Sequence, residues 1–272
     1  MTQPRESLIE VSGLRVEFEG RAAVDDVGFE IAPGEVLGLV GESGSGKSTL
    51  ARALLRLVPA ARGKVSFRGT DLLRCTGAAL RRLRRDLQIV FQDPLASLDP
   101  RMSVGEILAE PLEIFEPGLG KREGRTRVAE MLERVGLAPS VAERYPHEFS
   151  GGQCQRIAIA RAMMPGPQLL VCDEPVSSLD VSIQGQIVNL LSDLQRDLGT
   201  AMLFISHNLA VVRHLSDRVM VMYAGRIVEI AMREELFAAP VHPYTRALLA
   251  AVPDPAAALR PASEPLVYSY DQ

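Results

Sequence analysis

One eight-residue stretch limits the possible folds of this chain more than any other feature. It reads Gly41-Glu42-Ser43-Gly44-Ser45-Gly46-Lys47-Ser48, after an apolar run at 36–40 and before leucines at helical spacing. In this order, a strand, a glycine-rich turn and a helix point backbone N–H groups and the helix dipole at phosphate oxygens. Lys47 can reach the β- and γ-phosphates, and the Ser48 hydroxyl can ligate Mg²⁺. By residue frequencies alone, the pattern would arise in roughly one such chain per hundred.

An apolar run that ends in two acids is the second chemical feature. The run 169–172 is predicted as a buried strand, and Asp173 and Glu174 follow it. Ligands of open α/β sheets bind beyond the carboxyl ends of the strands, where the phosphate loop would also lie. Asp173 would hold the Mg²⁺ shell, and Glu174 would orient and deprotonate an attacking water. An apolar strand followed by two acids is common by itself. Together with the phosphate loop, it becomes a much more specific sign of a nucleotide site.

A third segment, Phe149-Ser150-Gly151-Gly152-Gln153, precedes a helix expected to begin near Cys154. Ser150 and two glycines at a helix N-terminus make a second anion site. Two phosphate sites exceed the needs of one nucleotide unless the second serves a neighbouring subunit. Taken alone, the segment would be a serine N-cap with flexible glycines.

The alternation of apolar runs with helix-period segments predicts a parallel sheet with crossover helices. The predicted strands are 36–40, 87–91, 169–172 and 201–206, with a hairpin formed by 219–223 and 226–230. One predicted helix carries Leu50, Leu54 and Leu57 on one face, and another runs from about Ile183 to Leu198. Strand signals stop between 93 and 165, where helix patterns at 104–111 and 126–135 predict an inserted helical lobe. The tail after Pro253 is expected to be extended or mobile.

Composition narrows the protein class. Of the 272 residues, 47% are apolar, which suffices for a substantial core, and the net charge of −4 argues against a nucleic-acid binder. The arginine run at 81–85 is interpreted as a solvated helix face. Apolar runs are far shorter than the ~18 residues that span a bilayer. Three widely spaced cysteines predict neither disulfides nor a zinc site, so we expect a soluble protein of the reducing cytosol.

The phosphate loop at 41–48, the Ser-Gly-Gly-Gln segment at 150–153 and the acid-ended strand at 169–174 occur in the order and spacing of the ATP-binding cassette (ABC) ATPases. The sequence resembles that family over about Ile9 to Pro253. Further matches are Gln92 at the family's glutamine loop, His207 at its switch histidine, and Phe18 at its adenine-stacking aromatic. Ser177-Ser178-Leu179-Asp180 matches the loop after the acidic strand. Singly, Phe18 and His207 would be read as core or surface residues; in this constellation we prefer the functional interpretation.

The resemblance implies an α/β fold: a P-loop NTPase (RecA-like) core with an N-terminal antiparallel β subdomain and an inserted α-helical subdomain. The predicted boundaries are 1–92 and 165–235 for the ATP-binding α/β core, 93–164 for the helical signature subdomain, and 236–272 for a C-terminal extension.

The resemblance also implies the site residues. The expected catalytic residues are Glu174, His207, Gln92 and Lys47. Those expected to bind ATP are Phe18, Gly41, Glu42, Ser43, Gly44, Ser45, Gly46, Lys47, Ser48, Thr49, Ser150, Gly151, Gly152, Gln153 and Asp180. Those expected around Mg²⁺ are Ser48, Gln92 and Asp173.

In the mechanism that the resemblance implies, two cassettes face each other head to tail. Each ATP lies between one phosphate loop and the partner's Ser150 and Gly152, and hydrolysis lets the halves separate. Gln92 would sense the γ-phosphate and Mg²⁺, and the segment 93–102 would pass the movement to a membrane subunit. The implied partners are two integral membrane permeases, a second ABC ATPase and, indirectly, an extracytoplasmic substrate-binding protein. The expected location is the cytoplasmic face of the cell membrane, without nucleic acid.

Three stretches are similar to the oligopeptide and dipeptide importer ATPases, in particular the second of their two paired ATPase subunits. They are Phe91 to Met102, Tyr145 to Phe149, and His242-Pro243-Tyr244-Thr245-Arg246-Ala247-Leu248-Leu249. Many members of that subfamily continue into a cysteine-bearing segment that can hold an iron–sulfur cluster. Since no cysteine follows Cys172, we predict no cluster here.

Several alternatives stay open at this point. Nickel, glutathione and cell-wall peptide importers share this ATPase type, and an exporter ATPase differs only in the subfamily stretches. A non-transport cassette acting on nucleic acid would carry coiled-coil or zinc insertions or a second cassette, which this sequence lacks. A regulatory protein with an inert ATPase fold is opposed by the presence of Lys47, Glu174 and His207.

Overall fold

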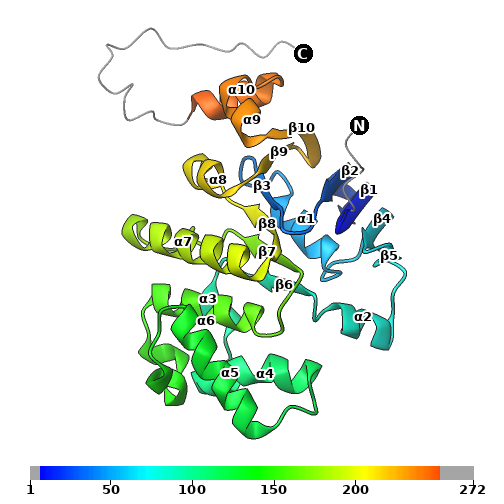
Figure 1. The fold of residues 1–272 in the computed structure, drawn as a ribbon. Coiled ribbons are helices and arrows are strands. Elements are labelled where there is room, and N and C mark those ends of the chain that lie inside the picture. Colours follow the sequence, from blue (N-terminus) through cyan, green and yellow to red (C-terminus); the bar gives the residue numbers. More distant parts are fainter. Residues whose placement is uncertain (1–6, 252–272) are drawn as a thin grey trace, which may run out of the picture.

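A computed structural model describes residues 7–251, in two sheets and a set of helices (Figure 1). The strands are β1 (Ile9–Phe18), β2 (Arg21–Ile31), β3 (Val36–Val40), β4 (Arg62–Phe67), β5 (Thr70–Asp71), β6 (Leu87–Val90), β7 (Leu169–Asp173), β8 (Ala201–Ile205), β9 (Arg218–Tyr223) and β10 (Arg226–Met232). The α-helices are α1 (Lys47–Leu54), α2 (Gly77–Leu83), α3 (Pro94–Ser97), α4 (Val104–Phe115), α5 (Lys121–Arg134), α6 (Gly151–Met163), α7 (Val181–Leu198), α8 (Leu209–Leu215), α9 (Arg233–Ala238) and α10 (Pro243–Ala250). Two 3₁₀ turns, Pro139–Glu143 and Pro146–Glu148, precede α6.

The central sheet has the strand order β10-β9-β3-β8-β7-β6. Strands β9, β3, β8, β7 and β6 run parallel, and β10 pairs antiparallel with β9 as the predicted hairpin. Parallel strands bring their carboxyl ends to one edge, so the loops after β3, β6, β7, β8 and β9 meet there. The predicted parallel sheet is confirmed, and this edge carries most of the predicted site residues.

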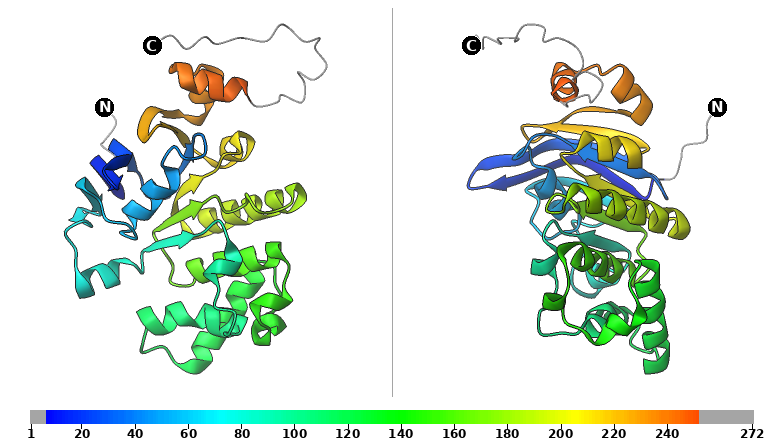
Figure 2. Two further views of the ribbon diagram at one scale, coloured as in Figure 1. Left: turned by 180° about the vertical axis from the view of Figure 1, so that it is seen from behind. Right: turned by 90° about the vertical axis from the view of Figure 1, so that its left-hand side faces the viewer.

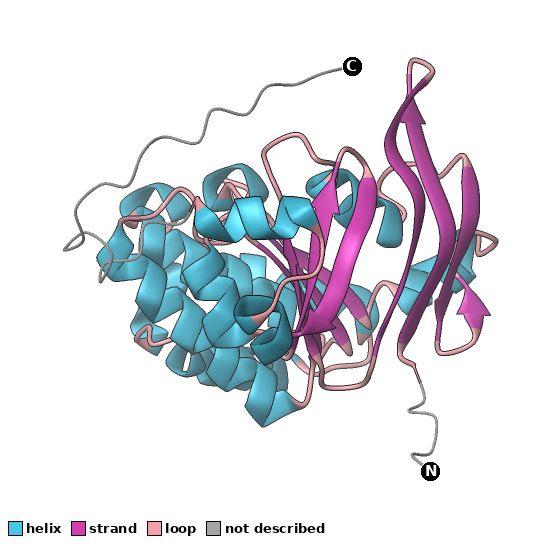
Figure 3. Ribbon diagram, turned by 90° about the horizontal axis from the view of Figure 1, so that it is seen from above, coloured by secondary structure: helices cyan, strands magenta, loops and turns pink. Residues whose placement is uncertain are grey.

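A second sheet, with the order β2-β1-β4-β5, is antiparallel throughout. Figure 3 shows it standing beside the central sheet at one side of the molecule. This is the N-terminal antiparallel subdomain that the family resemblance implied, so the predicted fold class is confirmed.

The central sheet separates two hydrophobic cores. Successive side chains of a strand point to opposite faces. On β3, Leu37 and Leu39 join the core shared with α1 and the antiparallel sheet, whereas Val36 and Val40 join the core on the other face. Because both faces are covered, β3, β7 and β8 are buried along their whole length and read in the sequence as continuous apolar runs.

Helices α3 to α6 follow β6 in the chain and precede β7 in the same sheet; Figure 1 shows them below it. The pattern at 104–111 predicted a helix end at Pro111, but α4 continues to Phe115. A proline inside a helix costs about 3 kcal/mol. Burial of Leu108 and Leu112 on either side of Pro111 offsets that cost.

Three further predicted helix boundaries are wrong. Helix α5 begins at Lys121, five residues before the expected start at 126. Helix α1 ends at Leu54 because Arg56 adopts a left-handed conformation (φ 53°), so Leu57 lies beyond the helix and is 46% exposed. Helix α6 begins at Gly151, three residues before the expected Cys154. Ser150 and Gln153 form a reciprocal capping box there, which fixes the earlier start.

The C-terminal elements α9 and α10 lie beyond β10, away from α4 and α5, in both Figure 1 and Figure 2. Of the predicted C-terminal extension, residues 236–251 are described, whereas the expected mobile tail after Pro253 lies outside the described residues. Within residues 7–251, no helix has the length and apolar character needed to cross a membrane.

Candidate nucleotide site

The phosphate loop leaves β3 at Gly41 and enters α1 at Lys47. A Cβ at Gly41 would lie 2.2 Å from the Met222 carbonyl oxygen, and a Cβ at Gly46, where φ is 105°, would lie 2.3 Å from the Ala23 carbonyl oxygen. Both neighbours are backbone atoms that cannot turn aside. The loop therefore packs so closely against β2 and β9 that only glycine fits at these two positions.

The Lys47 ammonium group is held inside the loop. Its Nζ donates hydrogen bonds to the carbonyl oxygens of Gly41, at 2.8 Å, and Glu42, at 2.7 Å. Burial lowers the pKa of Lys47, while the nearby carboxylates of Glu174 and Asp173 act in the opposite direction. The site thus offers a cation with weak hydration, which suits the oxygens of a phosphate chain.

Ser48 and Asp173 meet at the start of α1. The Ser48 hydroxyl donates to the Asp173 carboxylate at 2.7 Å, and Asp173 is only 2% exposed. Burial raises the pKa of Asp173, although the hydrogen bond from Ser48 and the guanidinium of Arg52, at 3.9 Å, favour the charged form. A buried carboxylate beside a hydroxyl is a donor set of hard oxygens that fits Mg²⁺, which would stabilise the charge of Asp173.

Glu174 and His207 form a pair at the same edge. His207 Nδ1 lies 3.3 Å from Glu174 Oε2; the Glu174 side chain is 18% exposed and the imidazole 61% exposed. Glu174 adopts a left-handed conformation (φ 51°), and its N–H donates to the Ile205 carbonyl at 3.1 Å. Such strain in a non-glycine residue concentrates at functional sites, and here it directs the carboxylate toward the loop after β8.

The glutamine loop and the loop after β7 are also in contact. The Ser178 hydroxyl donates to the Gln92 carbonyl at 3.4 Å. Gln92 is exposed, and the next residue, Asp93, caps α3 through the N–H groups of Leu95 and Ala96. Asp180 is exposed at the N-cap of α7. The structure therefore brings Gln92 beside the acid-ended strand but leaves Asp180 facing outward.

The segment Ser150–Gln153 lies apart from the phosphate loop. Ser150 Oγ accepts from the Gln153 N–H at 3.4 Å, which caps α6. A Cβ at Gly152 would lie 2.7 Å from Ile183 Cγ2 of α7, so the helix start packs against α7. Among the described residues, no hydrogen bond or ion pair joins this segment to the loop 41–48. Within the described residues, the two predicted anion-binding segments are thus not joined by a direct polar contact.

Phe18 ends β1 and is 48% exposed, so a flat ring is available to a stacking partner. It lies across the tight turn from Arg21 of β2.

Two family models match the sequence. The ABC transporter model covers residues 24–177, more than half of the chain, and a model for the C-terminal region of oligopeptide/dipeptide transporters covers 228–269. This chain belongs to the ABC transporter family.

Relatives of this cassette agree with that assignment. The oligopeptide transport ATP-binding protein OppF of Salmonella typhimurium is 53% identical over 93% of this chain and 80% of its own length. OppF of Escherichia coli is 52% identical over 94% of this chain and 80% of its own length. A putative peptide import ATP-binding protein of Brucella ovis is 55% identical over 91% and 79%. The predicted resemblance to the peptide importer subfamily is confirmed.

Two solved structures share the fold of the cassette. CbiO1 of Clostridium perfringens, described as part of an ABC transporter complex, has a TM-score of 0.77 at 29% identity and covers 86% of this chain and 92% of its own. The ATP-binding cassette MJ0796, a dimer bound to ADP and phosphate, has a TM-score of 0.75 at 27% identity. The match covers 83% of this chain and 98% of that structure's chain. Membership of this family makes the chain an ATP-binding ATPase component of an ABC transporter.

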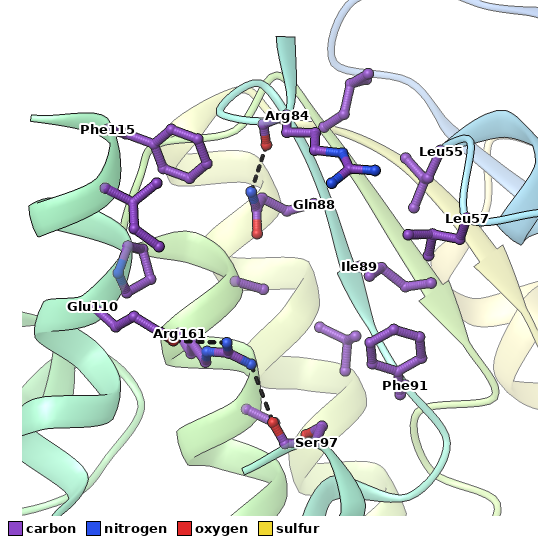
Figure 4. Close-up of a pocket in the computed structure, with 16 residues that line it drawn as sticks. Leu55, Leu57, Arg84, Gln88, Ile89, Phe91, Ser97, Glu110, Phe115 and Arg161 are labelled. Atoms are coloured by element: carbon purple, nitrogen blue, oxygen red, sulfur yellow. Dashed lines mark hydrogen bonds and ion pairs between the residues drawn. The ribbon is translucent and has the colours of Figure 1, made fainter. Parts of the chain in front are cut away.

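A groove of about 350 Å³ separates the central sheet of the cassette from its helical lobe (Figure 4). One wall comes from β6 and the residues after α1, including Leu57, and the other from α4 and α6, including Ile114. Arg161 of α6 fixes the lobe side, because it donates to Glu110 of α4 at 2.8 Å and to the Ser97 carbonyl at 3.1 Å. Leu57 and Ile114 are each close to half exposed, so the groove offers apolar surface to solvent.

Sequence reasoning missed both the groove and Arg52. The groove depends on two distant segments, so no local pattern could reveal it. Arg52 follows Ser48 by four residues and therefore shares its helix face. The four-residue spacing from Ser48 could therefore have predicted from the sequence that Arg52 lies near the site.

Proposed function

We propose that this chain is the ATP-hydrolysing subunit of a membrane importer for di- or oligopeptides, acting at the cytoplasmic face of the cell membrane. The observation that carries the ATPase part is the pairing of Glu174 with His207 beside the buried Ser48–Asp173 pair. A general base must lie within hydrogen-bond reach of a group that orients it, and this geometry meets that condition.

The proposed roles at the phosphate end follow from these contacts. The N–H groups of the loop 41–48 and the start of α1 at Thr49 bind the phosphates, together with Lys47. Ser48, Asp173 and Gln92 would hold Mg²⁺, which would neutralise negative charge on the phosphate oxygens. Phe18 stacks on the adenine.

At the hydrolysis step, the Glu174 carboxylate takes a proton from the attacking water. The His207 imidazole, 3.3 Å from Glu174 Oε2, keeps that carboxylate in place. Gln92 lies where the core meets the lobe, so its contact with the γ-phosphate would transmit the state of the site to the helices.

The proposed domains are an ATP-binding core of 1–92 and 165–235, a helical lobe of 93–164, and a C-terminal extension of 236–272.

The active unit is proposed to be a pair of cassettes, formed with a second ABC ATPase or a second copy. The separation of Ser150–Gln153 from the phosphate loop of the same chain supports this. In a head-to-tail pair, Ser150, Gly151, Gly152 and Gln153 of one subunit would reach the γ-phosphate held by the other. Asp180, exposed at the start of α7, would lie at the junction.

The groove between β6 and the lobe is proposed to receive a segment of a permease. Its apolar rim at Leu57 and Ile114 fits an amphipathic helix. One wall moves with the core and the other with the lobe, so closure around ATP would reach the permease directly. Two permeases, and indirectly a substrate-binding protein outside the membrane, complete the proposed importer.

Peptide is the proposed cargo because the relatives named above are oligopeptide or peptide import proteins. Nickel and glutathione importers are the alternative. The test is co-purification of the tagged full chain from detergent-solubilised native membranes, followed by reconstitution into vesicles and uptake of labelled tripeptide. Uptake that requires ATP and is lost in Glu174→Gln is the expected result. Recovery without membrane proteins would contradict the transport role and leave the ATPase intact.

A further inference from the structure

The C-terminal segment touches the phosphate loop at its first bend. The hydroxyl oxygen of Tyr244, on α10, accepts a hydrogen bond from the N–H of Glu42 at 3.1 Å, across 202 residues of sequence. A second contact comes from the β9–β10 turn, where the Gly225 N–H donates to the Ser45 carbonyl at 2.9 Å. Two loop peptides are therefore held from outside the loop.

Glu42 occupies a central place in this loop. Its N–H is bound by Tyr244, and its carbonyl oxygen accepts from the Lys47 ammonium at 2.7 Å. A shift of the Glu42 backbone would move the carbonyl that Lys47 contacts. Glu42 is therefore the single residue that links the Tyr244 hydroxyl to the Lys47 ammonium group.

Tyr244 is itself fixed from several sides. Its ring lies against that of Tyr223, with 4.3 Å between centroids. Its own N–H donates to His242 Nδ1 at 3.2 Å, which caps α10. Upstream, the Glu229 carboxylate of β10 accepts from the N–H groups of Val241 and His242 at 2.8 and 2.9 Å. A continuous set of contacts thus runs from β10 through α10 to the phosphate loop.

Apolar packing anchors the same helix. Tyr244, Leu248 and Leu249 pack against the core on the α10 side of the sheet, together with Val228 and Phe237. Burial also raises the pKa of Tyr244, so its hydroxyl stays neutral at physiological pH. The Glu42 N–H therefore has an acceptor that is attached to the folded core.

We propose that Tyr244 is a positioning residue for the phosphate loop, through which the C-terminal segment 229–250 sets the affinity of the site for ATP. The proposal rests on the proposed role of the loop 41–48 in ATP binding. A loop whose peptides are already fixed loses less conformational entropy when it closes on a ligand. Removal of the Tyr244 hydroxyl would free the Glu42 peptide and weaken nucleotide binding without touching a reacting atom.

The test compares Tyr244→Phe with Tyr223→Phe in the full chain. Each substitution removes one hydroxyl and keeps the pair of adjoining rings. Of the two hydroxyls, that of Tyr244 is the one hydrogen-bonded to the loop. We expect Tyr244→Phe to raise the dissociation constant for Mg-ATP and KM about 2- to 10-fold, with kcat within about 2-fold. Tyr223→Phe should leave all three unchanged. Titration calorimetry with ATP and steady-state hydrolysis measure them.

A double-mutant cycle separates positioning from general stability. Glu42→Pro removes the donor N–H, so Tyr244→Phe should have no further effect on ATP affinity in that background. Equal weakening by Tyr244→Phe with or without Glu42→Pro would overturn the proposal, as would an unchanged dissociation constant in the single variant. Failure of the unaltered chain to bind ATP would instead overturn the proposed function of the site.

Discussion

His207 Nδ1 and Glu174 Oε2 lie 3.3 Å apart, although 33 residues separate them in the chain. They come together because Asp173 of β7 is paired in register with Ile205 of β8. The residues that follow each strand leave the sheet side by side, beyond the edge where β3 releases the phosphate loop. The pair is therefore a product of strand order, and it should act as a unit.

Replacement of Glu174 by Gln should abolish turnover but not binding. The amide keeps the shape of the side chain but cannot accept the proton of water, and loss of a general base costs about 10²- to 10⁴-fold in rate. Hydrolysis should fall by that factor, while the dissociation constant for ATP changes less than about 3-fold. Calorimetric titration and phosphate release measure the two quantities.

His207→Ala is the companion variant. Because His207 acts through Glu174, the double variant should hydrolyse ATP no more slowly than Glu174→Gln alone. Full additivity of the two losses would show that the residues act independently, and normal turnover in Glu174→Gln would remove Glu174 from the role of base.

Asp173→Asn should stabilise the chain in the absence of metal and nucleotide. Burial raises the pKa of Asp173, so the folded state binds its proton more tightly than the unfolded state does. Stability from this group is present at low pH and is lost as pH rises from the ordinary value of 3.8 through the raised pKa. Asparagine is neutral throughout and can still accept from Ser48. Its advantage in the free energy of unfolding should therefore grow over that window and then level off.

Urea denaturation at a series of pH values measures this difference. The same variant should lose Mg²⁺-dependent hydrolysis by about 10²-fold or more, so stability and activity change in opposite directions. A variant less stable than the unaltered chain at neutral pH would show that the buried charge is compensated within the protein.

Much of the site could be predicted because its residues sit at strand ends. Apolar runs such as 36–40 and 169–172 locate buried parallel strands, and such strands end at a common edge. Other features could not be predicted in this way. Strand β1 alternates from Ile9, but its register shifts between Val11 and Leu14, around Gly13 at φ 58°, and that break hides the period of two.

The contact between Tyr244 and Glu42 has no local signal at all. It depends on the docking of α10 over β10 and on the placement of β9 next to β3. Both are long-range events decided by which apolar faces cover one another. The end of α1 before Leu57 is similar, since a single left-handed residue at Arg56 interrupted a regular leucine spacing. Local periodicity predicts elements, and packing decides where they stop.

Gly41→Ala should be far more damaging than Gly44→Ala. The new methyl at 41 would lie 2.2 Å from a backbone carbonyl oxygen, whereas nothing lies within 4 Å of a Cβ at 44. Gly44 has φ 81°, so alanine there costs only backbone strain of about 1–2 kcal/mol. Gly41→Ala should lose about 3 kcal/mol or more, together with ATP binding. Thermal unfolding checks the order, and equal losses at both positions would contradict it.

Ile114→Asp should uncouple the cassette from its membrane partners. Ile114 is 45% exposed on the lobe wall of the groove, so a charge there is tolerated by the fold but opposes an apolar partner. Leu198→Asp, at the end of α7 and 40% exposed, is the matched control because it lies outside the groove.

Both variants should bind ATP and unfold like the unaltered chain, within about 1 kcal/mol. Only Ile114→Asp should lose co-purification with integral membrane proteins, by about 10-fold or more, because a buried unpaired charge costs several kcal/mol at an interface. Undiminished recovery of those proteins with Ile114→Asp would place the permease contact elsewhere on the surface. Equal loss with Leu198→Asp would attribute the effect to added charge rather than to the groove.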